Sequence, residues 1–364
     1  MLAAAPQDTN VVTSPASLAE ALGMLTEGAR GTTLTELEAV LGASGQQRKD
    51  AFAALRGTLL PMDGDPAVVK KDTLPDVPVV HLADQVVVDD GYPVSADYLK
   101  ALAEDFGAGA QSVDLGSADG KRVLDAWVNH HTGGLIDKSA IEPDPSLRVV
   151  LQDAVVLAAR WTQPFLPEAT GTRPFTLADG SRVPVETMAS ARSVAYAELD
   201  GWRAVRLPYG DGQLYADLML PPSDVDPAAA SPDLLTKLSA ALDRATPTAV
   251  ELTLPTLDLK PGAMELRPVL ADAGAAHLWC GTDPDLTGIG PQDLCVSQAV
   301  QRAVLNVDEE GTIAAAVTEI GMAGSSAPGR PDKVLHLDRP FLMEIAAAHT
   351  SWSLFLAAVR DPRH

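Results

Sequence analysis

Two neighbouring serines, Ser325 and Ser326, lie in a stretch rich in glycine, serine and proline. A serine becomes a catalytic nucleophile only beside a base that is itself oriented by a third group. The sequence contains no Gly-x-Ser-x-Gly elbow, and no histidine and carboxylate stand in a pattern that would serve these serines. We therefore expect no catalytic residues and predict that the protein is not an enzyme.

His130 and His131 form the pair that most invites a metal site. Adjacent residues on a helix do not share a face, and no carboxylate or cysteine stands at ligand spacing from them. We therefore predict surface histidines, with no metal and no other cofactor. The two cysteines, Cys280 and Cys295, are interpreted as free thiols, buried or half-buried. A disulfide across the short loop between them is the alternative.

The longest segment without helix or hairpin signals runs from Val307 to Pro331. Loops longer than about 12–15 residues are uncommon in compact domains and are usually functional or disordered. In its first half every second residue is small: Thr312, Ala314, Ala316 and Thr318. Alternate side chains of a strand share a face, and no proline interrupts residues 311–327. The segment is compatible with a strand that enters a crowded sheet; a turn of Ala-rich helix is the alternative.

Composition narrows the class of protein. The chain has 364 residues, 46% hydrophobic and 4% aromatic, which is enough for a large aliphatic core. Its formal net charge of −22 repels nucleic acid and anionic membranes, so we expect neither as a partner. No apolar run approaches the ~18 residues of a membrane span. The first residues lack the basic region and apolar core of a signal peptide.

The first structured elements are two helices with clear end signals. Ser14 suits the N-cap position and Pro15 the first helical position, and leucines follow at helical spacing. Gly42 stands where the C-cap glycine of the second helix is expected. Further along, apolar runs of strand length predict strands at 79–88 and 149–157.

Several motifs together resemble the serpin family of serine protease inhibitors. Around the first two helices they are Asn-Val-Val-x-Ser-Pro-x-Ser from Asn10, Gly28-Ala29-Arg30-Gly31 and Val40-Leu41-Gly42. Near the other end, Asp308-Glu309-Glu310-Gly311-Thr312, with Ala-Ala-Ala-x-Thr from Ala314, looks like the hinge of the serpin reactive-centre loop. The resemblance covers nearly the whole chain, from Asn10 to Pro362.

The resemblance implies the serpin fold. This is one α+β domain over residues 1–364, with a large central mixed β-sheet, further sheets, about eight helices and an exposed reactive-centre loop at about 309–333. Serpins normally have a long helix before the first motif, but only nine residues precede Asn10. We expect that helix to be missing or truncated, which a misplaced start would explain. The family points to an extracellular protein, whereas the chain as it starts, without a signal peptide, points to a cytoplasmic one.

The resemblance also implies roles for particular residues. Seven form the hinge: Glu309, Gly311, Thr312, Ala314, Ala315, Ala316 and Thr318. Trp161 corresponds to the breach at the top of the main sheet. Three positions map onto a buried polar network, the shutter, where the sheet must part: Ser17, Asp153 and Gln301. Serpins have an asparagine and a histidine at the last two positions, so we expect Asp153 and Gln301 to have been exchanged as a hydrogen-bonded pair.

Counting from Gly311 with the spacing of inhibitory serpins places the bond attacked by a protease at Ser325–Ser326, with Met322 and Arg330 as alternatives. A small residue there suits an elastase-like or subtilisin-like serine protease. The resemblance implies an irreversible suicide-substrate inhibitor, whose cleaved loop inserts into the main sheet and traps the protease in a covalent complex. A non-inhibitory carrier, chaperone or storage protein is the alternative. We expect a monomer that heparin does not activate.

Overall fold

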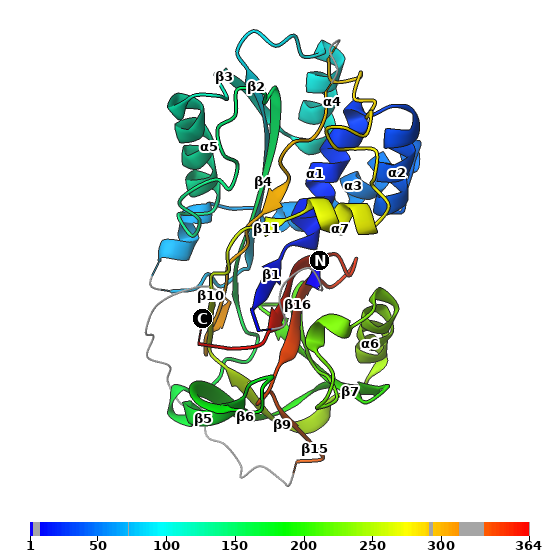
Figure 1. Cartoon of the computed structure of the whole chain (residues 1–364). Coiled ribbons are helices and arrows are strands. Elements are labelled where there is room, and N and C mark those ends of the chain that lie inside the picture. Colours follow the sequence, from blue (N-terminus) through cyan, green and yellow to red (C-terminus); the bar gives the residue numbers. More distant parts are fainter. Residues whose placement is uncertain (3–7, 72, 291–293, 313–330, 364) are drawn as a thin grey trace.

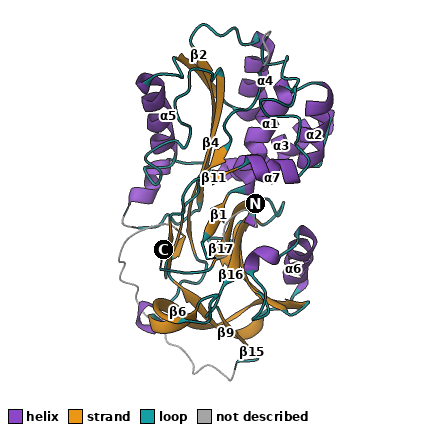
Figure 2. Cartoon of the chain, in the orientation of Figure 1, coloured by secondary structure: helices purple, strands orange, loops and turns teal. Residues whose placement is uncertain are grey.

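In the computed structural model, residues 1–2, 8–71, 73–290, 294–312 and 331–363 are described (Figure 1). They form seven α-helices: α1 (Pro15–Gly28), α2 (Gly31–Leu41), α3 (Gly45–Leu59), α4 (Ala96–Phe106), α5 (Ala118–His131), α6 (Pro232–Arg244) and α7 (Arg267–Asp272). Most helices lie in one half of the molecule, and the other half is mainly strands with α6 beside them (Figure 2). Among the described residues, no helix is both long and apolar enough to cross a membrane.

The described strands make two large sheets and one pair. The larger sheet has the order β1-β17-β16-β8-β7-β6-β9-β15, with β5 added to β6. Its strands are β1 (Val11–Thr13), β5 (Gly171–Thr176), β6 (Arg182–Leu199), β7 (Trp202–Tyr209), β8 (Leu214–Leu220), β9 (Thr248–Pro255), β15 (Lys333–His336), β16 (Phe341–Ala347) and β17 (Ser353–Val359). The large, mostly aliphatic core that the composition predicted is built mainly around this sheet.

The second sheet has the order β10-β13-β14-β4-β2-β3. Its strands are β2 (Val79–Asp89), β3 (Gly109–Val113), β4 (Val149–Arg160), β10 (Leu257–Leu259), β13 (Leu305–Val307) and β14 (Gly311–Thr312). The remaining pair is β11 (Met264–Glu265) with β12 (Val300–Gln301). Helix α5 lies along one side of β2 and β4, and α1 lies on the other (Figure 1).

The local signals in the sequence account for these elements. The Ser14 hydroxyl caps α1 by accepting a hydrogen bond from the Ser17 amide at 3.1 Å. Helix α2 ends at Gly42, whose φ of +73° is the left-handed conformation that glycine adopts readily. The strands expected at 79–88 and 149–157 are confirmed as β2 and β4, which pair antiparallel along their length.

The prediction for the cysteines is wrong. Cys280 and Cys295 form a disulfide that closes a separation of 15 positions, and both residues are exposed. The two chain segments also pair at Trp279 and Val296. The spacing of the two cysteines could not show that the chain brings Val296 back beside Trp279, because the residues between them give no hairpin signal.

The adjacent histidines at the end of α5 lie in different environments. His130 is exposed, whereas His131 is half-buried and contacts β2, with its Nδ1 3.0 Å from Nε2 of His81. The expectation of two surface histidines therefore holds for His130 alone. Among the described residues, no group of three or more histidine, cysteine or acidic side chains is arranged to hold a metal ion.

We predict that the disulfide contributes to stability. Replacing both residues (Cys280→Ser with Cys295→Ser) should lower the free energy of unfolding by about 2–4 kcal/mol, because the unfolded chain is then no longer closed into a loop. Thermal unfolding followed by circular dichroism measures the change. A thiol reductant should lower the melting temperature of the native chain and leave that of the double variant unchanged. Equal melting temperatures in all four cases would show that the bond is not a stabilising one.

Candidate functional site

A slot opens in the second sheet between β4 and the segment 296–307, which we call the facing segment. The cavity in it measures about 550 Å3 and is lined by apolar side chains of α1, β4 and residues 266–305, with a few polar groups among them. We call the end of the slot at Arg160 its top. There β14 pairs with Arg160 and Ala159 of β4 on one side and with Val307 of β13 on the other. Below Thr312, no ladder among the described residues joins the two walls. The sheet therefore has room for a further length of strand.

Thr312 is held in the top of the slot by a buried side-chain contact. Its hydroxyl lies 2.5 Å from the hydroxyl of Tyr209, and its exposed fraction is 3%. The Tyr209 ring stacks on Trp161 with 4.2 Å between the ring centres. Burial raises the pKa of the Tyr209 hydroxyl, which therefore stays neutral and able to donate. Thr312, the first inward-facing residue of the predicted hinge, thus occupies a buried position that accommodates a small polar side chain.

The chain just before Thr312 is fixed by backbone hydrogen bonds to the region of Trp161. The Trp161 amide donates to the Glu310 carbonyl at 2.8 Å, and its indole nitrogen donates to the Asp308 carbonyl at 3.0 Å. The Phe165 amide donates to the Glu309 carbonyl at 2.8 Å. The structure thus brings the predicted breach residue Trp161 together with the first part of the predicted hinge.

Gly311 is required by a close approach to β4. A Cβ atom at this position would lie 2.1 Å from the carbonyl oxygen of Ala159 and 2.8 Å from the Cα of Arg160. Both are backbone atoms, which cannot move aside as a flexible side chain can. Asp308 adds a cap, since its Oδ1 accepts hydrogen bonds from the amides of Glu310 and Gly311 at 2.9 and 3.0 Å.

The remaining predicted loop residues lie outside the described part of the chain. They are the hinge residues Ala314, Ala315, Ala316 and Thr318, and the candidates for the attacked bond, Met322, Ser325, Ser326 and Arg330.

The first turn of α1 bridges the two walls of the slot lower down. The Ser17 hydroxyl donates to Oδ1 of Asp153 on β4. On the other wall, Gln301 donates to the Ser14 carbonyl at 2.8 Å and accepts from the Ser14 amide at 3.1 Å and from the Thr13 hydroxyl at 2.5 Å. The expected hydrogen bond between Asp153 and Gln301 is therefore wrong, because Asp153 binds Ser17 of α1 and Gln301 binds Thr13 of β1 and the N-cap residue Ser14. The Gln301 side chain is long enough to reach the backbone of the N-cap residue Ser14, and the sequence pattern did not indicate this contact.

Three residues that the sequence analysis did not single out lie next to Asp153. Asp84 of β2 stands directly opposite it in the ladder, and Glu20 of α1 is fully buried. Arg56 of α3 binds both neighbours, at 2.9 Å from Glu20 and 2.7 Å from Asp84. Ser17 and Glu20 are three residues apart on α1, and such a spacing places two side chains on one helix face. That spacing was the signal in the sequence that could have placed Glu20 beside Ser17 and Asp153.

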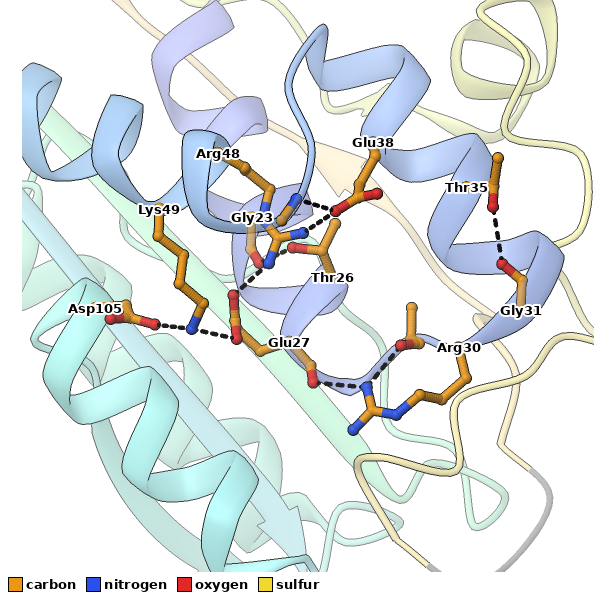
Figure 3. Close-up of polar contacts among 12 residues, drawn as sticks. Gly23, Thr26, Glu27, Arg30, Gly31, Thr35, Glu38, Arg48, Lys49 and Asp105 are labelled. Atoms are coloured by element: carbon orange, nitrogen blue, oxygen red, sulfur yellow. Dashed lines mark hydrogen bonds and ion pairs between the residues drawn. The ribbon is translucent and has the colours of Figure 1, made fainter.

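A second ionic network joins α1, which lines the slot, to α2, α3 and α4 (Figure 3). Glu27 of α1 binds Arg48 and Lys49 of α3 at 2.6 and 2.8 Å. Arg48 also binds Glu38 of α2 at 2.7 Å, and Lys49 binds Asp105 of α4 at 2.6 Å. The Arg48 side chain is almost fully buried, and its two carboxylate partners together compensate its charge. These ion pairs join α1, α2, α3 and α4 into one block of helices.

Comparisons with known proteins agree with this architecture. A family model described as "Serpin (serine protease inhibitor)" matches residues 1–362. Iripin-8 of Ixodes ricinus is 29% identical, over 96% of this chain and 88% of its own length. Leukocyte elastase inhibitor of Bos taurus is 28% identical, over 97% of this chain and 93% of its own length.

Solved structures show the same fold. The thermophilic serpin Tengpin in its native state has a TM-score of 0.82 at 23% identity, covering 99% of this chain and 90% of that one. Thyroxine-binding globulin in complex with thyroxine has a TM-score of 0.79 at 22% identity, covering 98% and 94% of the two chains.

We predict that Gly311→Ala expels the hinge from the slot. The new methyl group would overlap the Ala159 carbonyl, and overpacking of this kind costs about 1–3 kcal/mol. Limited proteolysis should then cut near residues 308–312 faster than in the native chain. Gly171→Ala is the matched control, because a Cβ there meets nothing within 4 Å. Identical proteolysis of all three proteins would contradict the close approach.

We predict that Tyr209→Phe destabilises the protein by about 1–3 kcal/mol, because the buried Thr312 hydroxyl loses its partner. Combining it with Thr312→Val removes both hydroxyls, so the double variant should lose less than the sum of the two single changes. Urea unfolding measures all four free energies. Strictly additive losses would mean that the two hydroxyls do not interact.

Proposed function

Because the chain belongs to the serpin family, we propose that it is an irreversible suicide-substrate inhibitor of serine endopeptidases. The observation that carries the proposal is the slot with Thr312 seated at its top between two walls. A protein that inserts a strand needs an acceptor of this shape. It also needs a hinge that enters the acceptor without a clash.

The register of β14 on β4 fixes what would follow Thr312 into the slot. Thr312 pairs with Ala159, and in an antiparallel ladder each step along the loop is one step back along β4. Continued downward, that register puts Ala314 opposite Leu157, Ala316 opposite Val155 and Thr318 opposite Asp153. These positions share a face with Asp153, which binds α1. In the inserted form the inward positions would therefore be occupied by small residues, as insertion requires.

The same register assigns a partner to Asp153. Its Oδ2 atom is buried without a hydrogen-bond partner among the described residues. A buried acceptor in this state is costly. In the inserted form, the hydroxyl of Thr318 would lie on the same face and could donate to it. Insertion would then satisfy an acceptor that the open slot leaves unsatisfied.

The driving force for insertion is backbone pairing. About ten inserted residues would add about ten ladder hydrogen bonds, each worth ~0.5–1.5 kcal/mol net, or on the order of 10 kcal/mol together. A protease still bound covalently to the cut end of the loop would be carried along and distorted. Displacement of catalytic groups by as little as about 1 Å can cost two orders of magnitude in rate, so the acyl-enzyme would persist.

The alternative is a non-inhibitory serpin that acts as a carrier, chaperone or storage protein. The family includes both kinds by name, since leukocyte elastase inhibitor and thyroxine-binding globulin are among the relatives. The small side chains at the inward hinge positions favour the inhibitor. The small residue at Ser325 favours an elastase-like or subtilisin-like target.

Incubation with a panel of serine proteases tests the proposal. We expect a covalent complex that survives SDS, together with a released C-terminal peptide. The N-terminal sequence of that peptide identifies the attacked bond, expected at Ser325–Ser326, with cleavage after Met322 or Arg330 as the alternatives. Cleavage of the loop by every protease tried, without any stable complex, would falsify the inhibitor function.

A hinge substitution tests the insertion step. Ala316→Arg would place a charge on the inward face opposite Val155, where burying it is costly. Insertion should then slow, and the variant should be cleaved as a substrate, with complex yield reduced at least about tenfold. Ile313→Glu is the control, because it changes charge on the other face. Equal loss of complex in the two variants would contradict the assigned register.

A further inference from the structure

Three carboxyl groups lie together beside the slot, on the face of β4 that α1 covers; two are buried, and the third, Asp153, is half-buried and lines the cavity. Glu20 has no exposed surface, and the side chain of Asp84 is 1% exposed. Asp84 and Asp153 lie directly opposite each other on neighbouring strands. Like charges in this arrangement repel. We call Glu20, Asp84 and Asp153 the acid cluster.

One guanidinium group faces the acid cluster. Nη1 of Arg56 binds Glu20 and Asp84, and Nη2 donates to the Phe106 carbonyl at the end of α4. On the α1 side, Asp153 accepts a hydrogen bond from Ser17. These contacts supply one positive charge for three acids. At least one acid is therefore expected to stay protonated, since a buried unpaired charge is very costly.

The oxygen atoms of the acid cluster show the same deficit. Glu20 Oε1, Asp84 Oδ1 and Asp153 Oδ2 are each buried without a hydrogen-bond partner among the described residues. Burial raises the pKa of all three carboxyl groups, and for Glu20 the negative charge of Asp84 adds to the rise, which reaches a pKa of about 8. Burial lowers the pKa of Arg56, but Glu20 and Asp84 raise it by more, so the guanidinium stays charged.

We propose that the acid cluster binds protons at neutral pH, that bound protons hold β4 against α1, and that their loss favours opening of the slot. The direction follows from linkage. The state seen in the structure, with β4 held against α1, binds the protons more tightly than a widened state in which water reaches the carboxyl groups. We call the first the closed state, and it is favoured at low pH. The advantage is complete below about pH 4, where both states are protonated, and is lost as the pH rises toward about 8.

The consequence for function is regulatory, and it rests on the proposed inhibitor function. Widening of the slot would move β4, together with its paired strand β2, relative to α1, which would separate Asp153 from Ser17 and from Glu20. An inhibitor of this kind would accept its cleaved loop more readily in mildly alkaline than in mildly acid surroundings. The proton binding itself does not depend on that function.

Asp153→Asn tests the inference, because the amide keeps the shape of the side chain and removes its charge. Hydrogen–deuterium exchange of β4 is measured in the native and variant chains at about pH 5 and pH 8. Comparing the two proteins at the same pH cancels the intrinsic pH dependence of exchange. At pH 5 the two should agree within about twofold, and at pH 8 the native chain should exchange about tenfold faster, since one proton is worth up to tenfold per pH unit.

Asp50→Asn is the matched control. It makes the same change of charge at an exposed position of α3, the helix that carries Arg56, and should follow the native chain at both pH values. If Asp153→Asn does not fold, Asp84→Asn replaces it with the same expected result. The inference is overturned if the ratio of the native to the variant exchange rate of β4 is the same at pH 5 and pH 8.

A parallel assay of covalent complex formation separates this inference from the inhibitor function. If covalent complexes form but the native-to-variant ratio of exchange rates is the same at pH 5 and pH 8, the role of the acid cluster is overturned. The proposed inhibitor function is then still supported. A pH-dependent ratio in a protein that forms no complex with any protease would support the acid cluster and count against the inhibitor function.

Discussion

The fold depends on a place in its second sheet that backbone pairing leaves open. Strand β4 pairs with β2 along one edge, but among the described residues its other edge meets only β14, over two residues. A further strand at this edge would add ladder hydrogen bonds to backbone groups that β14 does not reach. The block of helices, the seat of Thr312 and the contacts of Gln301 all serve to keep the two walls of the slot in place around it.

The first turn of α1 has a central position in this arrangement. It holds β4 through Ser17 and the facing segment through the Ser14 backbone. The two walls therefore do not bind each other at this level; each binds the same helix. Because each wall is bound separately to α1, one wall can shift without unfolding the other. At the far end of α1, the ion pairs of Glu27 with Arg48 and Lys49 hold this helix against α3.

Much of this could be predicted from the sequence, because the relevant signals are local. End signals of α1 and α2 and the apolar runs of β2 and β4 depend on neighbouring residues alone. The hinge role of Gly311 and Thr312 stays a prediction; the structure shows that both residues form the short strand β14. The disulfide, the Tyr209 contact and the true partners of Gln301 depend on residues that meet only after the chain has folded. The acid cluster had a weaker signal, a single aspartate in the middle of each of two apolar strands, whose meaning required the register.

The disulfide adds a dependence on chemistry outside the protein. Cys295 stands just before the facing segment, and the bond ties the base of that wall to Trp279, whose side chain is buried among the helices. Since both sulfur-bearing residues are exposed, dissolved thiols can reach the bond. In oxidising surroundings the base of this wall is held by a covalent bond and by backbone hydrogen bonds, whereas in reducing ones only the hydrogen bonds remain. The redox state of the surroundings therefore decides how firmly the base of this wall is held.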